Sequence, residues 1–105
     1  MVITFDKEYL KELYENGKCS DKQHRYQPEI VKAYAKCIYR LQEATKMEDL
    51  YPFHSLRYEV LKGDKAGISS IRVNDQYRIE FTVKNEGVEP VITVCNILEL
   101  SNHYK

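Results

Sequence analysis

SIRVNDQYRIEF, residues 70–81, is the stretch that decides the fold. Polar and apolar residues alternate on both sides of a short polar centre, as they do in two half-buried antiparallel strands. Because successive side chains on a strand point to opposite faces, the apolar residues of both halves must share one face. A three-residue connection, residues 74–76, then pairs Val73 with Tyr77 and Ile71 with Ile79. The stretch therefore predicts a β-hairpin.

The same register places two arginines opposite each other on the other face of the hairpin. Arg72 lies directly across from Arg78, and facing like charges are unfavourable by roughly several tenths of a kcal/mol. Two adjacent guanidinium groups suit a site that grips a phosphate, because each forks onto phosphate oxygens. A second interpretation stays open, in which Glu80, or Glu59 on a neighbouring strand, neutralises the pair on a solvated face.

The segments around the hairpin predict further strands. Residues 57–60 alternate polar with apolar, and a turn follows at residues 63–67. After the hairpin, residues 85–87 predict a turn. Residues 91–98 predict a more fully buried strand, apolar on both faces near its start, with Pro90 fitting at its first residue. A run of four antiparallel strands is expected.

The first half of the chain predicts a short strand and two helices. Residues 2–5 are β-prone, Asp6 fits the N-cap of a first helix, and Gly17 fits its left-handed C-terminal cap. Pro28 suits the first turn of a second helix, which is expected to run to about Met47. The apolar stripe of this helix comprises Ile30, Tyr34, Cys37, Ile38, Leu41 and Ala44. We expect one α+β domain, residues 1–105, with the helices packed on one face of the sheet.

Composition indicates an ordinary globular protein. Of the 105 residues, 43% are hydrophobic and 30% charged, and no apolar run reaches transmembrane length. The first residues lack the plan of a signal peptide, so a cytoplasmic protein is expected. Three cysteines, odd in number and far apart, favour neither a disulfide framework nor a zinc site, and are expected to be buried or half-buried thiols.

The charge balance restricts any nucleic-acid function. The chain has 16 basic and 16 acidic residues, whereas proteins that capture free nucleic acid usually carry a basic excess. If this chain binds RNA, its positive charge must be local, or another particle must deliver the RNA.

The last residues, 99–105, read ELSNHYK and hold three side chains suited to RNA chemistry. His103 is fitted to proton transfer near neutral pH, Tyr104 to stacking or proton donation, and Lys105 to phosphate. A base, an acid and a cation cluster suffice to cleave RNA without a metal ion. A fraying terminus is the alternative. Lys62, beside the turn that precedes the hairpin, would add to a cation cluster or simply be solvated, and Lys65 lies within that turn.

Residues 61–64, LKGD, with Gly67 and residues 70–81, resemble the core of HigB-type toxins of the RelE/ParE superfamily, and residues 97–105 resemble the tails of that superfamily. The resemblance implies a RelE-like fold and a HigA-like antitoxin with a helix-turn-helix domain. It also implies cleavage of mRNA in the ribosomal A site with no small-molecule cofactor. A toxin that reads mRNA held by the ribosome needs no basic excess of its own.

The resemblance also implies roles for individual residues. Arg78 matches the arginine that stabilises the phosphate, Lys62 matches a basic residue of the LKGD segment, and His103 and Tyr104 match the tail that supplies proton transfer and stacking. Glu59 stands where some HigB toxins have a catalytic histidine, so Glu59 is a second candidate for the base.

Arg72, Lys65 and Lys105 are the expected RNA-binding residues. His24 and His54, in loop-like segments, are expected to be incidental. Two other functions stay open, a ParE-like toxin that binds DNA gyrase and an inactive module that binds an antitoxin.

Overall fold

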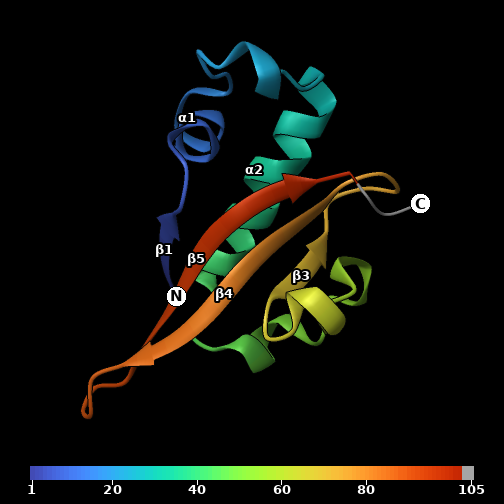
Figure 1. The fold of residues 1–105 in the computed structure, drawn as a ribbon. Helices are drawn as coiled ribbons and strands as arrows, with labels where there is room; N and C mark the ends of the chain where they lie inside the picture. Colours follow the sequence, from blue (N-terminus) through green and yellow to red (C-terminus); the bar gives the residue numbers. More distant parts are fainter. Residues whose placement is uncertain (103–105) are drawn as a thin grey trace.

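The computed structural model describes residues 1–102, and its centre is one five-stranded sheet (Figure 1). The strands lie in the order β1-β5-β4-β3-β2. Their bounds are β1 (Val2–Phe5), β2 (Glu59–Val60), β3 (Ser69–Arg72), β4 (Arg78–Glu86) and β5 (Ile92–Ser101). Strands β2 to β5 are antiparallel neighbours, as predicted, whereas β1 pairs parallel with β5.

Two helices, α1 (Glu8–Asn16) and α2 (Pro28–Glu43), cover the same face of the sheet (Figure 1). The predicted caps at Gly17 and Pro28 are confirmed: Gly17 has φ 75° and donates its N–H to the Leu13 carbonyl, and Pro28 opens α2. The α+β arrangement expected from the sequence is therefore present.

Two predicted helix ends are wrong. The N-cap of α1 is Lys7 instead of Asp6. Helix α2 ends at Glu43 instead of near Met47, because the Asp49 carboxylate accepts hydrogen bonds from the Thr45 and Lys46 N–H groups at 2.9 and 3.2 Å. These bonds fold the chain into a turn and a 3₁₀ segment, η2 (Met47–Leu50), so the helix does not continue.

The core lies between the helices and the covered face of the sheet. Helix α2 contributes its predicted stripe, apart from Ala44, which is half-buried. The sheet contributes Ile71, Ile79, Phe81, Cys95, Ile97 and Leu100. The two helices are joined by a buried hydrogen bond of 2.7 Å from the Tyr34 hydroxyl to the Leu10 carbonyl.

The three cysteines are free thiols, with Cys37 and Cys95 buried and Cys19 half-buried, as predicted. Burial raises the pKa of the Cys37 thiol to about 11 and that of Cys95 to about 11. Both thiols are therefore protonated near neutral pH and poor nucleophiles.

The hairpin of β4 and β5 is longer than the sequence predicts. Strand β4 continues to Glu86, and β5 begins at Ile92, so Pro90 lies in the connecting loop. The predicted burial at the start of β5 is wrong, because Val91 and Ile92 are exposed. Figure 1 shows this end of the hairpin extending past the helices, where no second layer covers it.

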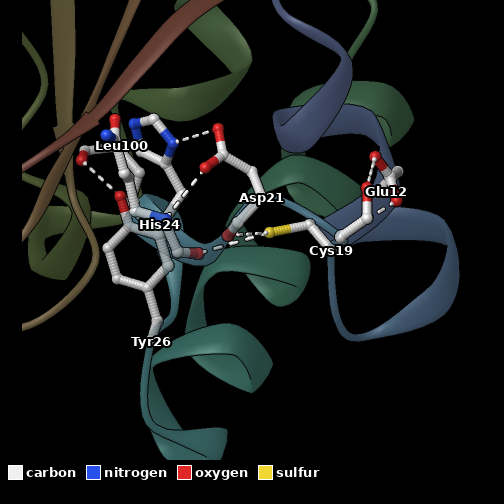
Figure 2. A network of polar contacts seen from close by, with 8 residues as sticks. Glu12, Cys19, Asp21, His24, Tyr26 and Leu100 are labelled. Atoms are coloured by element: carbon white, nitrogen blue, oxygen red, sulfur yellow. Dashed lines mark hydrogen bonds and ion pairs between the residues drawn. The ribbon is translucent and has the colours of Figure 1, made fainter.

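The connection between the helices is held by a compact polar network (Figure 2). Within it, the short segment η1 (Lys22–His24) begins at Asp21, whose carboxylate lies 2.8 Å from the His24 Nδ1 and accepts the Gln23 N–H at 2.9 Å. The hydrogen bond from His24, with that from Gln23, lowers the pKa of the Asp21 carboxyl. Folding thus favours the ionised carboxylate, and this contribution to stability is lost as the pH falls below about 4.

The same connection is fixed against α1 and the end of β5. The His24 ring stacks on Tyr9 with centroids 3.7 Å apart, and the Tyr26 hydroxyl donates to the Leu100 carbonyl at 3.3 Å. The Tyr26 ring also meets Tyr77 of the predicted hairpin edge-on. His24 therefore has a structural role.

None of the helices within residues 1–102 combines the length and apolar character needed to cross a lipid bilayer.

Replacing Tyr34 by phenylalanine tests the contact between the helices. We expect Tyr34→Phe to lower the free energy of unfolding by about 1 kcal/mol, because the buried Leu10 carbonyl loses a hydrogen-bond donor. Urea titration followed by circular dichroism measures the change. Tyr39→Phe, at an exposed tyrosine of the same helix, is the control. Equal stability of the two variants would contradict the assigned role.

Candidate nucleic-acid interface

The predicted hairpin register is confirmed. Ile71 pairs with Ile79, and Arg72 pairs with Arg78. The connection is closed by the Val73 N–H, which donates to the Tyr77 carbonyl at 2.9 Å. Since Ile71 and Ile79 enter the core beneath the helices, the two arginines belong to the opposite face of the sheet.

Arg78 is held tightly, and only 8% of the residue is exposed. Its Nε donates to the Ser70 hydroxyl, and its Nη2 donates to the Arg57 carbonyl at 2.6 Å and to the Ser70 carbonyl at 3.3 Å. These acceptors come from β3 and from the residue that follows the 3₁₀ segment η3 (His54–Leu56). The guanidinium is therefore fixed in one orientation.

Glu59 stands beside this guanidinium. Strand β2 pairs with β3 so that Glu59 is opposite Ser70, and a Glu59 carboxylate oxygen lies 3.6 Å from the Arg78 Nη2. The Glu59 side chain is 53% exposed. Water or a substrate can therefore reach a carboxylate whose neighbour is a fixed cation.

Two other predicted cations are paired with carboxylates. Arg72 bonds to Asp75, whose side chain is 96% exposed. Lys65, from η4 (Gly63–Lys65), bonds both carboxylate oxygens of the buried Glu80 at 3.0 and 2.9 Å. Lys62 is exposed, and no carboxylate within residues 1–102 forms an ion pair with it.

These pairs bear on the two interpretations that the sequence left open. Glu59 does contact Arg78, but Glu80 binds Lys65, and Arg72 forms its ion pair with Asp75. The pair of Arg72 with Asp75 is solvent-exposed and contributes little, so an arriving phosphate can replace Asp75 at small cost. The pair of Lys65 with Glu80 is more firmly built, which favours a structural role for Lys65.

The end of β5 runs directly past Arg78. Ser101 is the strand partner of Arg78 and is buried. His103, Tyr104 and Lys105 lie outside the described residues.

Sequence reasoning missed a hollow of about 500 Å³ next to Glu59. Its lining includes Glu59, His54 and the aromatic residues Tyr51, Phe53 and Tyr58. The segment YPFH, residues 51–54, has no periodicity, so nothing in the sequence places it beside the hairpin. The concentration of aromatic residues there was the available signal.

Within residues 1–102, no group of three or more histidine, cysteine, aspartate or glutamate side chains is arranged to hold a metal ion.

The model of a family described as RelE-like toxin of type II toxin-antitoxin system HigB matches residues 3–92. The chain belongs to this family. Toxin HigB-1 of Vibrio cholerae serotype O1 is 35% identical over 82 residues, which cover 77% of this chain and 82% of that toxin. This HigB-like toxin therefore belongs to a toxin–antitoxin system, and its family implies an antitoxin partner.

A solved structure supports the fold of the HigB-like toxin. The YoeB/ParE toxin from Agrobacterium tumefaciens superposes with a TM-score of 0.58 at 17% sequence identity, over 99% of this chain and 100% of that chain. This likeness shows the RelE-like fold alone.

The two lysines near η4 are expected to differ in their effect on stability. Lys65→Met removes a partner of the buried Glu80 and should lower the free energy of unfolding by roughly 1–3 kcal/mol. Lys62→Met should change it by less than about 0.5 kcal/mol, as at other exposed positions. Chemical denaturation of both variants measures this difference, and a larger loss for Lys62→Met would contradict the assigned roles.

Proposed function

We propose that this HigB-like toxin is a ribosome-dependent mRNA endonuclease that acts in the cytoplasm without a metal ion. The observation that carries the proposal is the fixed Arg78 guanidinium with the accessible Glu59 carboxylate 3.6 Å away. A cation that can bind the phosphate and a carboxylate that can accept the proton therefore lie next to each other.

The proposed reaction is an attack by the ribose 2′-oxygen on the neighbouring phosphorus. A base takes the proton of the 2′-hydroxyl, the new bond from the 2′-oxygen to phosphorus forms, and the bond to the 5′-oxygen breaks. The products are a 2′,3′-cyclic phosphate and a free 5′-hydroxyl, which receives a proton from an acid. Glu59 is the base among the described residues, and His103 and Tyr104 remain the proposed tail residues for proton transfer and stacking.

The cations have separate roles in this proposal. Arg78 stabilises the charge that builds on phosphorus, and because its acceptors already hold it in place, it needs no reorganisation during the reaction. Lys62, exposed and three residues after Glu59 in the chain, would add a second positive charge. Arg72 and Lys105 would contact the RNA backbone, whereas Lys65 is already held by the buried Glu80.

The charge balance of the chain favours an mRNA substrate that is already bound to the ribosome. The formal net charge is zero. Lys65, Arg72 and Arg78 each form an ion pair with a carboxylate of the same chain. Such a surface binds free RNA weakly. When the ribosome already holds the mRNA, the toxin does not need a basic surface of its own to capture it.

Charge removal at the site tests the cleavage mechanism. Arg78→Ala should abolish growth arrest while leaving binding of the antitoxin intact, because the nearly buried Arg78 offers little surface to a protein partner. Arg78 is buried, so Lys62→Ala supplies a second test at an exposed residue, with an expected loss of about a hundredfold in cleavage rate. Lys84→Ala, at an exposed lysine farther along β4, is the control. Full toxicity of Arg78→Ala would contradict the mechanism.

The role of the ribosome is tested with purified components. The toxin should cut mRNA on programmed ribosomes and leave the same mRNA intact in free solution. Mapping of 5′ ends after a short induction extends this test to cells. Arrest with intact transcripts and cleaved DNA would instead support inhibition of DNA gyrase.

A further inference from the structure

The hollow beside Glu59 is built by one short stretch of chain, residues 50–60. Leu50, which is buried, lies at its floor, and exposed aromatic side chains stand around it. The volume of about 500 Å³ is ample for a nucleobase. Glu59 also lines the hollow, and its carboxylate lies 3.6 Å from the Arg78 Nη2.

The aromatic rings of the hollow present a surface for stacking. Tyr51 and Tyr58 stack on each other with centroids 5.9 Å apart and an interplanar angle of 28°, and the Tyr51 residue is still 56% exposed. Phe53 is also exposed, and the Arg40 guanidinium lies 4.7 Å from the centre of its ring. Rings that stay largely in water although they are already ordered are suited to binding a flat ligand.

Arg57 brings an exposed guanidinium to the hollow from a backbone whose carbonyl is bound by Arg78. It is the only non-glycine residue with positive φ among residues 1–102, at φ 44° and ψ 53°. Such a conformation costs free energy in a residue with a side chain and tends to occur at functional sites. Here it allows the Arg57 carbonyl to accept the Arg78 Nη2 at 2.6 Å while its exposed side chain lines the hollow.

We propose that this hollow binds an unstacked guanine base of the RNA whose phosphate lies at Arg78. The base stacks on Tyr51, and the Arg57 guanidinium, whose forked donors match the O6 and N7 acceptors of guanine, reads the base edge. The assignment rests on the proposed nuclease function and adds to it the residues that select the cleavage site.

The experiment compares cleavage sites in three variants with those of the wild type. Tyr51→Ala removes the stacking surface, and Arg57→Gly removes the guanidinium while glycine keeps the left-handed backbone that holds the carbonyl on Arg78. Tyr39→Ala, at a tyrosine of α2 that is 55% exposed and outside the hollow, is the matched control. Mapping 5′ ends after a short induction gives both the cleavage rate and the base preference.

The expected result is a guanine preference at one position near the cut in the wild type and in Tyr39→Ala. Tyr51→Ala should cut about tenfold more slowly, and Arg57→Gly should cut with the guanine preference lost. Unchanged rate and base preference in both variants would overturn the assignment while leaving the nuclease intact. Loss of neutralisation by the antitoxin in Tyr51→Ala, with unchanged cleavage, would also overturn it and assign the hollow to the antitoxin.

A binding measurement keeps the assignment testable if the wild type cuts no RNA. Guanosine 5′-monophosphate should shift the NMR signals of residues 51–59 in the wild type more strongly than uridine 5′-monophosphate. The shift should be absent in Tyr51→Ala and retained in Tyr39→Ala. Equal or absent shifts with the two nucleotides would overturn the assignment independently of the nuclease test.

Discussion

The Arg78 guanidinium joins the sheet to the segment that carries much of the candidate site. It is nearly buried, so its charge requires partners, and it finds them in the Ser70 hydroxyl and carbonyl, the Arg57 carbonyl and the Glu59 carboxylate. Ser70 belongs to β3, whereas Arg57 and Glu59 belong to the stretch that precedes it. One side chain thereby fixes where the hollow and the proposed base stand relative to the hairpin.

The distribution of charge follows from this arrangement. A protein with no net charge retains a usable cation patch only if some cations are more weakly paired than others. Lys65 is held by the buried Glu80, whereas Arg72 shares an exposed aspartate and Lys62 has no ion-pair partner in the described part of the chain. Lys65 is therefore part of a structural ion pair, whereas a phosphate can bind Arg72 and Lys62. So few available cations fit an RNA that a larger particle delivers.

The exposed part of the proposed site is Glu59, whereas Arg78 beside it is nearly buried. Figure 1 shows both helices on one face of the sheet, and the strand register places Arg72 and Arg78 on the other. Strand β5 brings Ser101 alongside Arg78. The network around Asp21 and His24 supports this geometry, because Tyr26 from the same connection binds the Leu100 carbonyl next to Ser101 (Figure 2).

The sequence alone determined the hairpin, the pairing of Arg72 with Arg78 and the α+β order, because strand and helix periods are local patterns that burial enforces. Only tertiary structure decided where α2 ends and that Val91 is exposed, since these depend on the Asp49 side chain and on whether a second layer covers the strand. The hollow near Glu59 was likewise out of reach of the sequence. Its aperiodic walls are tied to the sheet by the hydrogen bond from Arg78 to the Arg57 carbonyl and by the ion pair of Arg78 with Glu59, and such contacts have no signature in the order of residues.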